Sequence, residues 1–133
     1  MLFRSKLGAM LRTVGEIMHG PDELPLVSAQ AAMPDALLIM TEKRFGCVGV
    51  RDDQGHLAGL ITDGDLRRHM DGLLALKAGQ VMTASPRTVP ATMLAAEALH
   101  LMNSWRITVL FVVDQDRPVG ILHIHDLLRA GLV

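Results

Sequence analysis

The sequence is poor in aromatic residues, with no tyrosine, one tryptophan and three phenylalanines among its 133 residues. Proteins that bind single-stranded nucleic acid stack the bases on aromatic side chains, and the formal net charge of -1 provides no excess of cations for phosphate backbones. Half of the residues are apolar and a fifth are charged, as in ordinary globular domains. We therefore predict a globular protein with no nucleic-acid partner.

Cysteine and long apolar runs are scarce as well. The single Cys47 cannot form an internal disulfide and lies in an apolar run, which is typical of a small core residue in a reducing compartment. The longest apolar runs, such as residues 108–113, have the length of a strand, whereas a membrane helix needs about 20 residues. Residues 1–14 contain polar residues throughout and no cleavage site for a signal peptide. These absences predict a cytoplasmic protein with no membrane partner.

Catalytic and metal-binding motifs are also missing. No serine or cysteine nucleophile has a recognisable base beside it in the sequence, and no glycine-rich loop of the P-loop type occurs. Residues 52–55 faintly resemble a calcium loop but lack the later acidic ligands, so they are interpreted as a hairpin turn. We therefore predict no catalytic residue, no metal site and no required cofactor.

What the sequence does contain is an internal repeat. The stretch GLITDGDLRR at residues 59–68 returns as GILHIHDLLR at residues 120–129. Before the hairpin turn the offset, from Met40 to Met102, is 62 residues; after it the offset, from Asp65 to Asp126, is 61. A loop tolerates such a one-residue deletion. Each half is predicted to form strand, helix, strand, strand and helix, with the longer helices at residues 34–43 and 93–104 and the hairpins at residues 47–62 and 109–123.

The repeat divides the chain into residues 14–74 and 75–133, preceded by a leader of residues 1–13. A repeat of about 60 residues has only a marginal core of its own. We therefore predict an α/β (α+β) fold in which two pseudo-twofold-related repeats pack as one module. The leader is predicted to be an amphipathic helix that packs on the module or joins it to an upstream domain; its apolar residues at helical spacing are Leu2, Phe3, Leu7, Met10, Leu11 and Val14.

The doubled pattern of helix, β-run, Asp-containing turn and strand-turn-helix phrase resembles a tandem pair of CBS domains over residues 14–133. Phrases such as IMHGPDELPLV, LITDGDLRRHMDG and LHIHDLLRAGLV resemble, more narrowly, the C-terminal CBS pair of D-arabinose 5-phosphate isomerases. Those enzymes convert ribulose 5-phosphate to arabinose 5-phosphate for Kdo and lipopolysaccharide synthesis in Gram-negative bacteria. In that family a sugar isomerase (SIS) domain precedes the pair and holds the catalytic residues. The resemblance implies that this chain is a regulatory or assembly region and not itself an enzyme.

The resemblance also implies a ligand site. In CBS pairs the Thr of the motif meets the phosphate, and the Asp meets the ribose, of a nucleotide in the cleft between the repeats. Thr62 and Asp65 match that motif, and the Asp63-Gly64 turn before the helix adds backbone N–H groups suited to an anion. The alternative is that Thr62 or Asp63 only caps the following helix, a contribution of about 1 kcal/mol that needs no ligand.

The second copy departs from the motif. His123 stands at the place of the Thr, His125 follows two residues later, and Asp126 keeps the place of the diol-binding acid. An imidazole could donate a hydrogen bond to a phosphate or carboxylate, or it could simply pack. A metal site at His123 and His125 would need a third ligand, and none is clearly placed to supply it.

Four other residues complete the candidate site. Arg106, at the end of the second long helix like Arg44 at the end of the first, either complements the helix dipole or reaches an anionic ligand. Thr108 could supply a hydroxyl to the same ligand. Met18 and Met82, just ahead of the first strand of each repeat, are more typical of core residues but could line the cleft.

Together these features predict a regulatory CBS pair that binds a nucleotide-type effector and transmits its presence to an upstream SIS domain. The pathway suggests CMP-Kdo as the effector, with AMP or ATP as the alternative. Two other functions stay open: a homo-oligomerisation module with empty clefts, and a metal sensor that uses His123 and His125.

Overall fold

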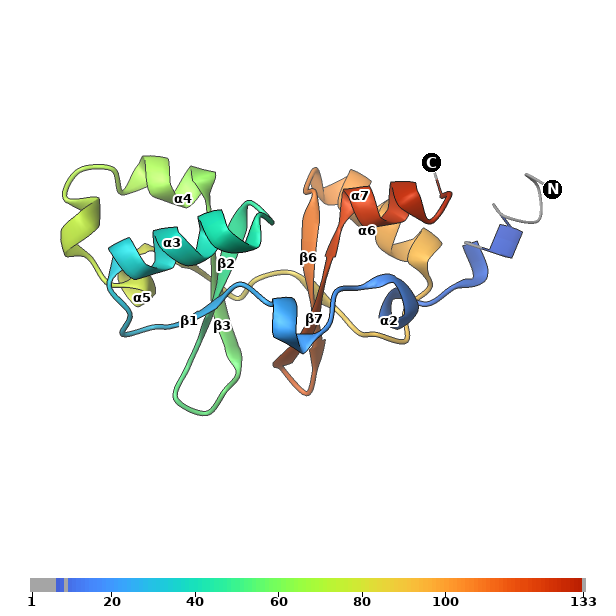
Figure 1. Ribbon diagram of the computed structural model, residues 1–133, viewed down its shortest axis with the longest axis horizontal. Coiled ribbons are helices and arrows are strands. Elements are labelled where there is room, and N and C mark those ends of the chain that lie inside the picture. Colours follow the sequence, from blue (N-terminus) through green and yellow to red (C-terminus); the bar gives the residue numbers. More distant parts are fainter. Residues whose placement is uncertain (1–6, 9, 133) are drawn as a thin grey trace. The chain divides into compact units, whose positions relative to one another are not determined.

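The computed structural model describes residues 7–8 and 10–132 (Figure 1). Short helices and strands alternate along the chain. In order they are α2 (Val14–Ile17), η1 (Pro21–Glu23), β1 (Leu26–Ser28), α3 (Met33–Lys43), β2 (Cys47–Arg51), β3 (Leu57–Thr62), α4 (Asp63–Arg68), η2 (Leu73–Ala75), α5 (Ala78–Val81), β4 (Thr83–Ala84), β5 (Thr88–Val89), α6 (Ala95–Trp105), β6 (Val109–Asp114), β7 (Arg117–His123) and α7 (Ile124–Arg129).

The chain packs into two compact units. Unit 1 falls within Met1–Asp22 and Arg87–Val133, and unit 2 is Glu23–Pro86. Each unit combines parts of both sequence repeats, because α2 contacts α6 and β7 of the second repeat while α5 and β4 contact strands of the first. Figure 1 shows α3 and α4 in unit 2, and α6 and α7 in unit 1.

The two sheets repeat one topology. In unit 2 the strand order is β1-β2-β3-β4, with β1 parallel to β2 and the other pairs antiparallel. In unit 1 the order is β5-β6-β7, and a single bridge from His19 to Ile121 takes the place that β4 has beside β3. The register shifts once in each hairpin, between Val50 and Arg51 and between Val112 and Val113. The predicted order of strand, helix, strand, strand and helix is confirmed in both repeats.

The hairpin loops differ in length, as the change of offset predicted. The first is a turn in which Asp52 Oδ1 accepts hydrogen bonds from the backbone N–H groups of Gln54 and His56, both 2.9 Å long. The second has only Gln115 and Asp116 between paired residues, at φ values of 52° and 64°. Two consecutive residues in the left-handed region form the type of tight turn that matches the twist of the strands.

Each unit has its own hydrophobic core. Val14 of α2 is fully buried in the core of unit 1, whereas Ala78 and Val81 of α5 are fully buried in the core of unit 2. The short helices ahead of each repeat's strands therefore contribute to the core of the unit formed mainly by the other repeat. Cys47 is completely buried, and burial raises the pKa of its thiol to about 12, which agrees with the prediction of a packed core residue.

The predicted leader helix is correct only in part. Residues 7, 8, 10 and 11 are helical, and Leu7, Met10 and Leu11 expose their side chains, so these residues do not pack on the module as one stripe with Val14. The helix breaks at Thr13, which is extended, pairs with Leu94 and caps α2. Leu2 and Phe3 lie outside the described residues.

Candidate functional site

The first candidate site lies where β3 ends and α4 begins. Thr62 is the N-cap of α4 and Asp65 is its third helical residue, which is the spacing of a capping box. The Asp65 carboxylate turns back to accept hydrogen bonds from the backbone N–H and the hydroxyl of Thr62, 2.9 Å and 3.2 Å long. The helix cap that the sequence left as an alternative for Thr62 is therefore present.

Asp65 is buried, with only 2% of the residue exposed. Its second oxygen accepts a bond of 2.5 Å from the Thr83 hydroxyl and another of 2.5 Å from the Arg68 guanidinium. Burial alone would raise the pKa of this carboxyl, but the bonds from Thr83, Thr62 and Arg68 outweigh it and hold the pKa below its ordinary value. Four donors fill the roughly four acceptor positions of a carboxylate, so a ligand hydroxyl would have to displace one of them.

The second candidate site, at the junction of β7 and α7, has the same architecture with different donors. Asp126 accepts a 2.8 Å bond from the backbone N–H of His123 on one oxygen. Its other oxygen contacts Nε2 of His19 at 2.8 Å and the guanidinium of Arg129. Within the described part of the chain three donors reach this buried carboxylate, against four at Asp65, because an imidazole has replaced the hydroxyl of the cap. The oxygen bonded to His123 keeps room for one more donor.

The two histidines of the second copy lie together. The ring centroids of His123 and His125 are 4.3 Å apart, and Nδ1 of His123 accepts a 3.1 Å bond from the backbone N–H of His125. Burial lowers the pKa of His123, and the neighbouring His125 lowers it further. A neutral His123 that accepts through Nδ1 carries its proton on Nε2, which leaves that nitrogen as a donor for an anion. His125 is exposed.

The two methionines lie against glycines of the neighbouring strands. A Cβ at Gly59 would lie 2.3 Å from Sδ of Met82, and a Cβ at Gly120 would lie 2.2 Å from Sδ of Met18. Both methionines are half-buried at the C-terminal ends of short helices. The repeated glycines are therefore required for close packing of the methionines on the sheets.

Three further candidates are exposed: Asp63, Arg106 and Thr108. Arg106 is the C-cap of α6 and has a φ of 56°, as its counterpart Arg44 after α3 has a φ of 64°. Both arginines hold the left-handed position where glycine is most common, a feature that the helix-dipole interpretation missed. The backbone carbonyl of Thr108 accepts a 2.8 Å bond from the N–H of Ile124, so this residue is tied to the start of α7.

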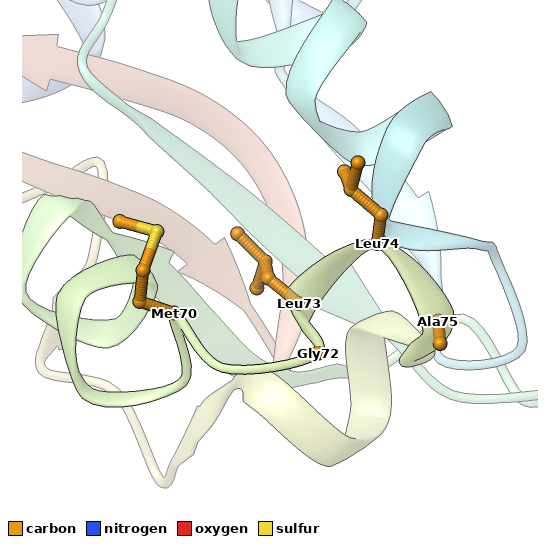
Figure 2. Close-up of a pocket in the computed structure, with 5 residues that line it drawn as sticks. All are labelled: Met70, Gly72, Leu73, Leu74 and Ala75. Atoms are coloured by element: carbon orange, nitrogen blue, oxygen red, sulfur yellow. The ribbon is translucent and has the colours of Figure 1, made fainter.

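Two pockets of different character lie in the described part of unit 2. One of about 220 Å³ lies between α3 and α4 and includes Asp63 and Thr41 in its lining. A larger one of about 540 Å³ is lined by apolar residues of the segment after α4 (Figure 2): Met70, Gly72, Leu73, Leu74 and Ala75. The larger pocket offers no charged group to a nucleotide.

Sequence reasoning missed four residues that bond to these carboxylates: Arg68, Arg129, Thr83 and His19. The last two arrive from the other repeat. Each follows a methionine at the end of a short helix and donates to the buried carboxylate of the unit into which its segment packs. The phrases EIMH at residues 16–19 and QVMT at residues 80–83 occupy equivalent places, which was the available signal. In the described ranges no group of three potential ligand side chains could hold a metal ion, and no helix has the length and apolar character to cross a membrane.

Comparison with known proteins adds three findings. The family model of the CBS domain matches residues 14–72 and 78–133. Arabinose 5-phosphate isomerase KdsD of Pseudomonas aeruginosa is 46% identical over 128 residues, and that of Escherichia coli K12 is 45% identical over 127. Each alignment covers 93% of this chain but 39% of the relative, so the chain spans about two fifths of the length of these curated relatives.

Among solved structures, CBSX2 in complex with AMP has a TM-score of 0.79 and 29% identity, over 91% of this chain and 96% of that one. The CBS domain of a bacterial CNNM/CorC family Mg2+ transporter in complex with ATP has a TM-score of 0.80 over 98% of this chain and 94% of that one. At 21% identity, the second likeness concerns the fold alone.

Proposed function

The chain belongs to the CBS domain family, and we propose that this tandem pair is the regulatory region of an arabinose 5-phosphate isomerase. The pair resembles the corresponding region of KdsD, and it binds a nucleotide-type effector whose presence it transmits to an SIS isomerase domain. The pair itself does no chemistry. An effector regulates only if it binds one arrangement of the domains better than another, so the ligand contacts must differ between the active and inactive states of the parent enzyme.

This proposal rests on the different numbers of hydrogen-bond donors that reach the two buried carboxylates. Asp65 has four donors, whereas one oxygen of Asp126 has a single donor from the described residues and can accept a ligand hydroxyl. His123 Nε2 and the exposed groups of Arg106 and Thr108 provide donors for an anion in the same unit. A ribose diol at Asp126 with a phosphate nearby matches this set, and CBSX2, 29% identical, has been solved with AMP.

In unit 2 the ligand contact is the Thr62 hydroxyl. Its 3.2 Å bond to Asp65 is the longest of the four at that carboxylate, so rotating the hydroxyl towards a phosphate costs the least. Asp63 lies next to it and is exposed. Met18 and Met82 present polarizable surfaces on which a base or sugar can pack.

The effector that we propose is CMP-Kdo, since its cytidine diol, single phosphate and sugar carboxylate suit an acceptor at Asp126 and donors at His123 and Arg106. Isothermal calorimetry of the chain with CMP-Kdo, CMP, AMP and ATP tests this choice. We expect CMP-Kdo to bind most tightly. Binding of AMP or ATP without binding of CMP-Kdo would make the chain an adenosine-nucleotide sensor instead, and no binding of any of the four would overturn the sensor function.

Arg106→Gly separates ligand binding from folding. Glycine relieves the left-handed strain at this position, so we expect the free energy of unfolding to rise by about 1 kcal/mol. Loss of the guanidinium removes a charge-assisted bond, so the Kd for the effector should rise at least about tenfold. Arg44→Gly is the matched control because it has the same backbone conformation after the other long helix. The control should be stabilised equally and bind normally; equal loss of affinity in both variants would contradict a specific role for Arg106.

A second candidate function, self-association, is favoured by the apolar surface of unit 2. Leu38, Met70 and Leu74 are exposed to 67%, 63% and 66%, and two of them border the larger pocket. Exposed apolar patches mark interaction surfaces. We expect the chain to sediment as a dimer or larger species, Leu74→Glu to sediment as a monomer, and Leu94→Glu, on unit 1, to leave the assembly intact. A monomeric parent chain in sedimentation velocity would exclude this function.

A further inference from the structure

Each buried carboxylate is hydrogen-bonded to a residue in a short segment from the other repeat. In unit 1 this is the α2 segment, residues 14–19, and in unit 2 it is the α5 segment, residues 78–83. In unit 2 the Thr83 hydroxyl donates to Asp65, and in unit 1 Nε2 of His19 lies 2.8 Å from Asp126. In both units the segment also pairs with a strand through its backbone; His19 exchanges two hydrogen bonds with Ile121, of 2.9 Å and 3.1 Å. The two contacts are equivalent in place, but only the one in unit 1 contains an imidazole, the side chain whose unperturbed pKa lies near neutral pH.

The chemistry of the His19 contact depends on the charge of the ring. An ionised carboxylate only accepts hydrogen bonds, so the Nε2 facing Asp126 must carry a proton. When Nδ1 also takes up a proton, the bond between a neutral donor and an anion becomes a bond between two opposite charges. Charge-assisted bonds are roughly twice as strong as neutral ones. We propose that the His19–Asp126 contact is a proton-dependent clamp that holds the α2 segment on unit 1 more firmly at acidic than at alkaline pH.

The groups around the pair determine where the proton goes. Asp126 contacts His19 from α7, and Arg129 bonds to the same oxygen of Asp126. The backbone N–H of His123 bonds to the other oxygen, and the ring of His125 lies 4.3 Å from that of His123. Burial and the neighbouring cations lower the pKa of His123, so this ring takes up a proton less readily than a free imidazole does. Arg129 is mostly exposed and keeps its charge throughout. His19 is the ring in direct contact with the carboxylate of Asp126, at 2.8 Å.

The clamp has a consequence for the segment that it holds. Val14 fills the core of unit 1 and Met18 lies over Gly120, and both precede His19 within six residues. Proton uptake at His19 therefore stabilises the packing of the α2 segment against unit 1. The corresponding contact in unit 2 has no such dependence, since the Thr83 hydroxyl has the same charge from pH 5 to pH 8. The nearby His69 contacts the backbone carbonyl of Asp65, at 2.9 Å from Nδ1, and not the segment that carries Thr83. This inference does not depend on nucleotide binding.

Native-state hydrogen exchange tests the clamp with an internal control. Peptides covering residues 14–20 and 78–84 are followed in one sample at pH 6 and pH 8, with the intrinsic pH dependence of exchange removed. We expect protection of residues 14–20 to be about fivefold greater at pH 6, the ratio implied by replacing a neutral bond with a charged one. Protection of residues 78–84 should not change between the two values.

The variant His19→Thr gives unit 1 the threonine that unit 2 has at the equivalent position, Thr83. It should abolish the difference between pH 6 and pH 8 in residues 14–20 while keeping the segment protected. His123→Thr tests whether the neighbouring ring is responsible instead and should leave the difference in place. Equal protection at both pH values in the parent chain, or a pH difference that survives His19→Thr, would overturn the proposal. A difference lost only in His123→Thr would assign the effect to that ring.

Discussion

Asp65→Asn should lower the free energy of unfolding by about 2–3 kcal/mol, because the cap accepts through a neutral group and donors on the other side lose their acceptor. The substitution changes hardly any volume. However, one end of an amide is an NH2 group, and each oxygen of Asp65 accepts from two donors. Whichever way the amide turns, an N–H group would face either Thr62 or the pair of Thr83 and Arg68. Because Thr83 and Arg68 are exposed enough to turn to water, the amide oxygen should stay on the backbone N–H of Thr62, and the loss comes from the broken charge-assisted bond of Arg68 and from the NH2 group left facing it.

The same substitution should change the dependence of stability on pH. The hydrogen bonds at Asp65 hold its pKa below the ordinary value, so the folded state binds fewer protons than the unfolded state does. The stabilisation is therefore fully present above the unfolded pKa of about 4 and is lost as the pH falls through the lower folded value. In Asp65→Asn this part of the acid denaturation should disappear.

Urea unfolding at pH 7 and at a series of acidic pH values measures both effects. Asp71→Asn, an exposed position of the same unit, is the control for removing one negative charge. A loss of less than about 0.5 kcal/mol in Asp65→Asn, the level of ordinary surface substitutions, would mean that water replaces the bonds of the carboxylate. In that case the capping network would not be what holds the strand-turn-helix phrase together.

The motif alone did not distinguish a helix cap from a ligand contact, because a Thr followed three residues later by an Asp fits both. The distinction depends on counting donors at each oxygen, and those donors come from segments far away in the sequence. Thr83 reaches Asp65 across 18 residues, and His19 reaches Asp126 across 107. Strand and helix order, by contrast, followed from local periodicity and from the repeat itself. That is why the hairpins and long helices were predicted within a few residues of their observed bounds.

The pairing of the short helices with the units could not be predicted from periodicity. The phrases EIMH and QVMT are so similar that either could cover either glycine. The glycine faces are equivalent as well, since Gly59 and Gly120 both leave room for a methionine sulfur. The observed arrangement, in which each helix covers the sheet of the other repeat, is a property of the whole chain. It explains why Thr83 and His19 were not recognised as part of the candidate sites.

Gly120→Ala tests that arrangement with an expected loss of about 3 kcal/mol, near the upper end for overpacking a tight core. The new Cβ would lie 2.2 Å from Sδ of Met18 and 2.9 Å from the carbonyl oxygen of His19. The methionine side chain is flexible and can move aside. The carbonyl cannot move as easily, because it accepts a 3.1 Å bond from the backbone N–H of Ile121. The substitution should therefore push the α2 segment off the sheet of unit 1.

A double-mutant cycle with Met18→Ala separates the two clashes. Removing the methionine should recover part of the loss caused by Gly120→Ala, and the remainder measures the contact with the His19 carbonyl. Gly20→Ala is the matched control, because a Cβ there has no heavy atom within 4 Å and its φ is not positive. Urea unfolding of the four proteins of the cycle and of the control gives the values. If Gly120→Ala costs no more than Gly20→Ala, the α2 segment does not pack on unit 1 in solution, and the clamp at His19 would lose its structural basis.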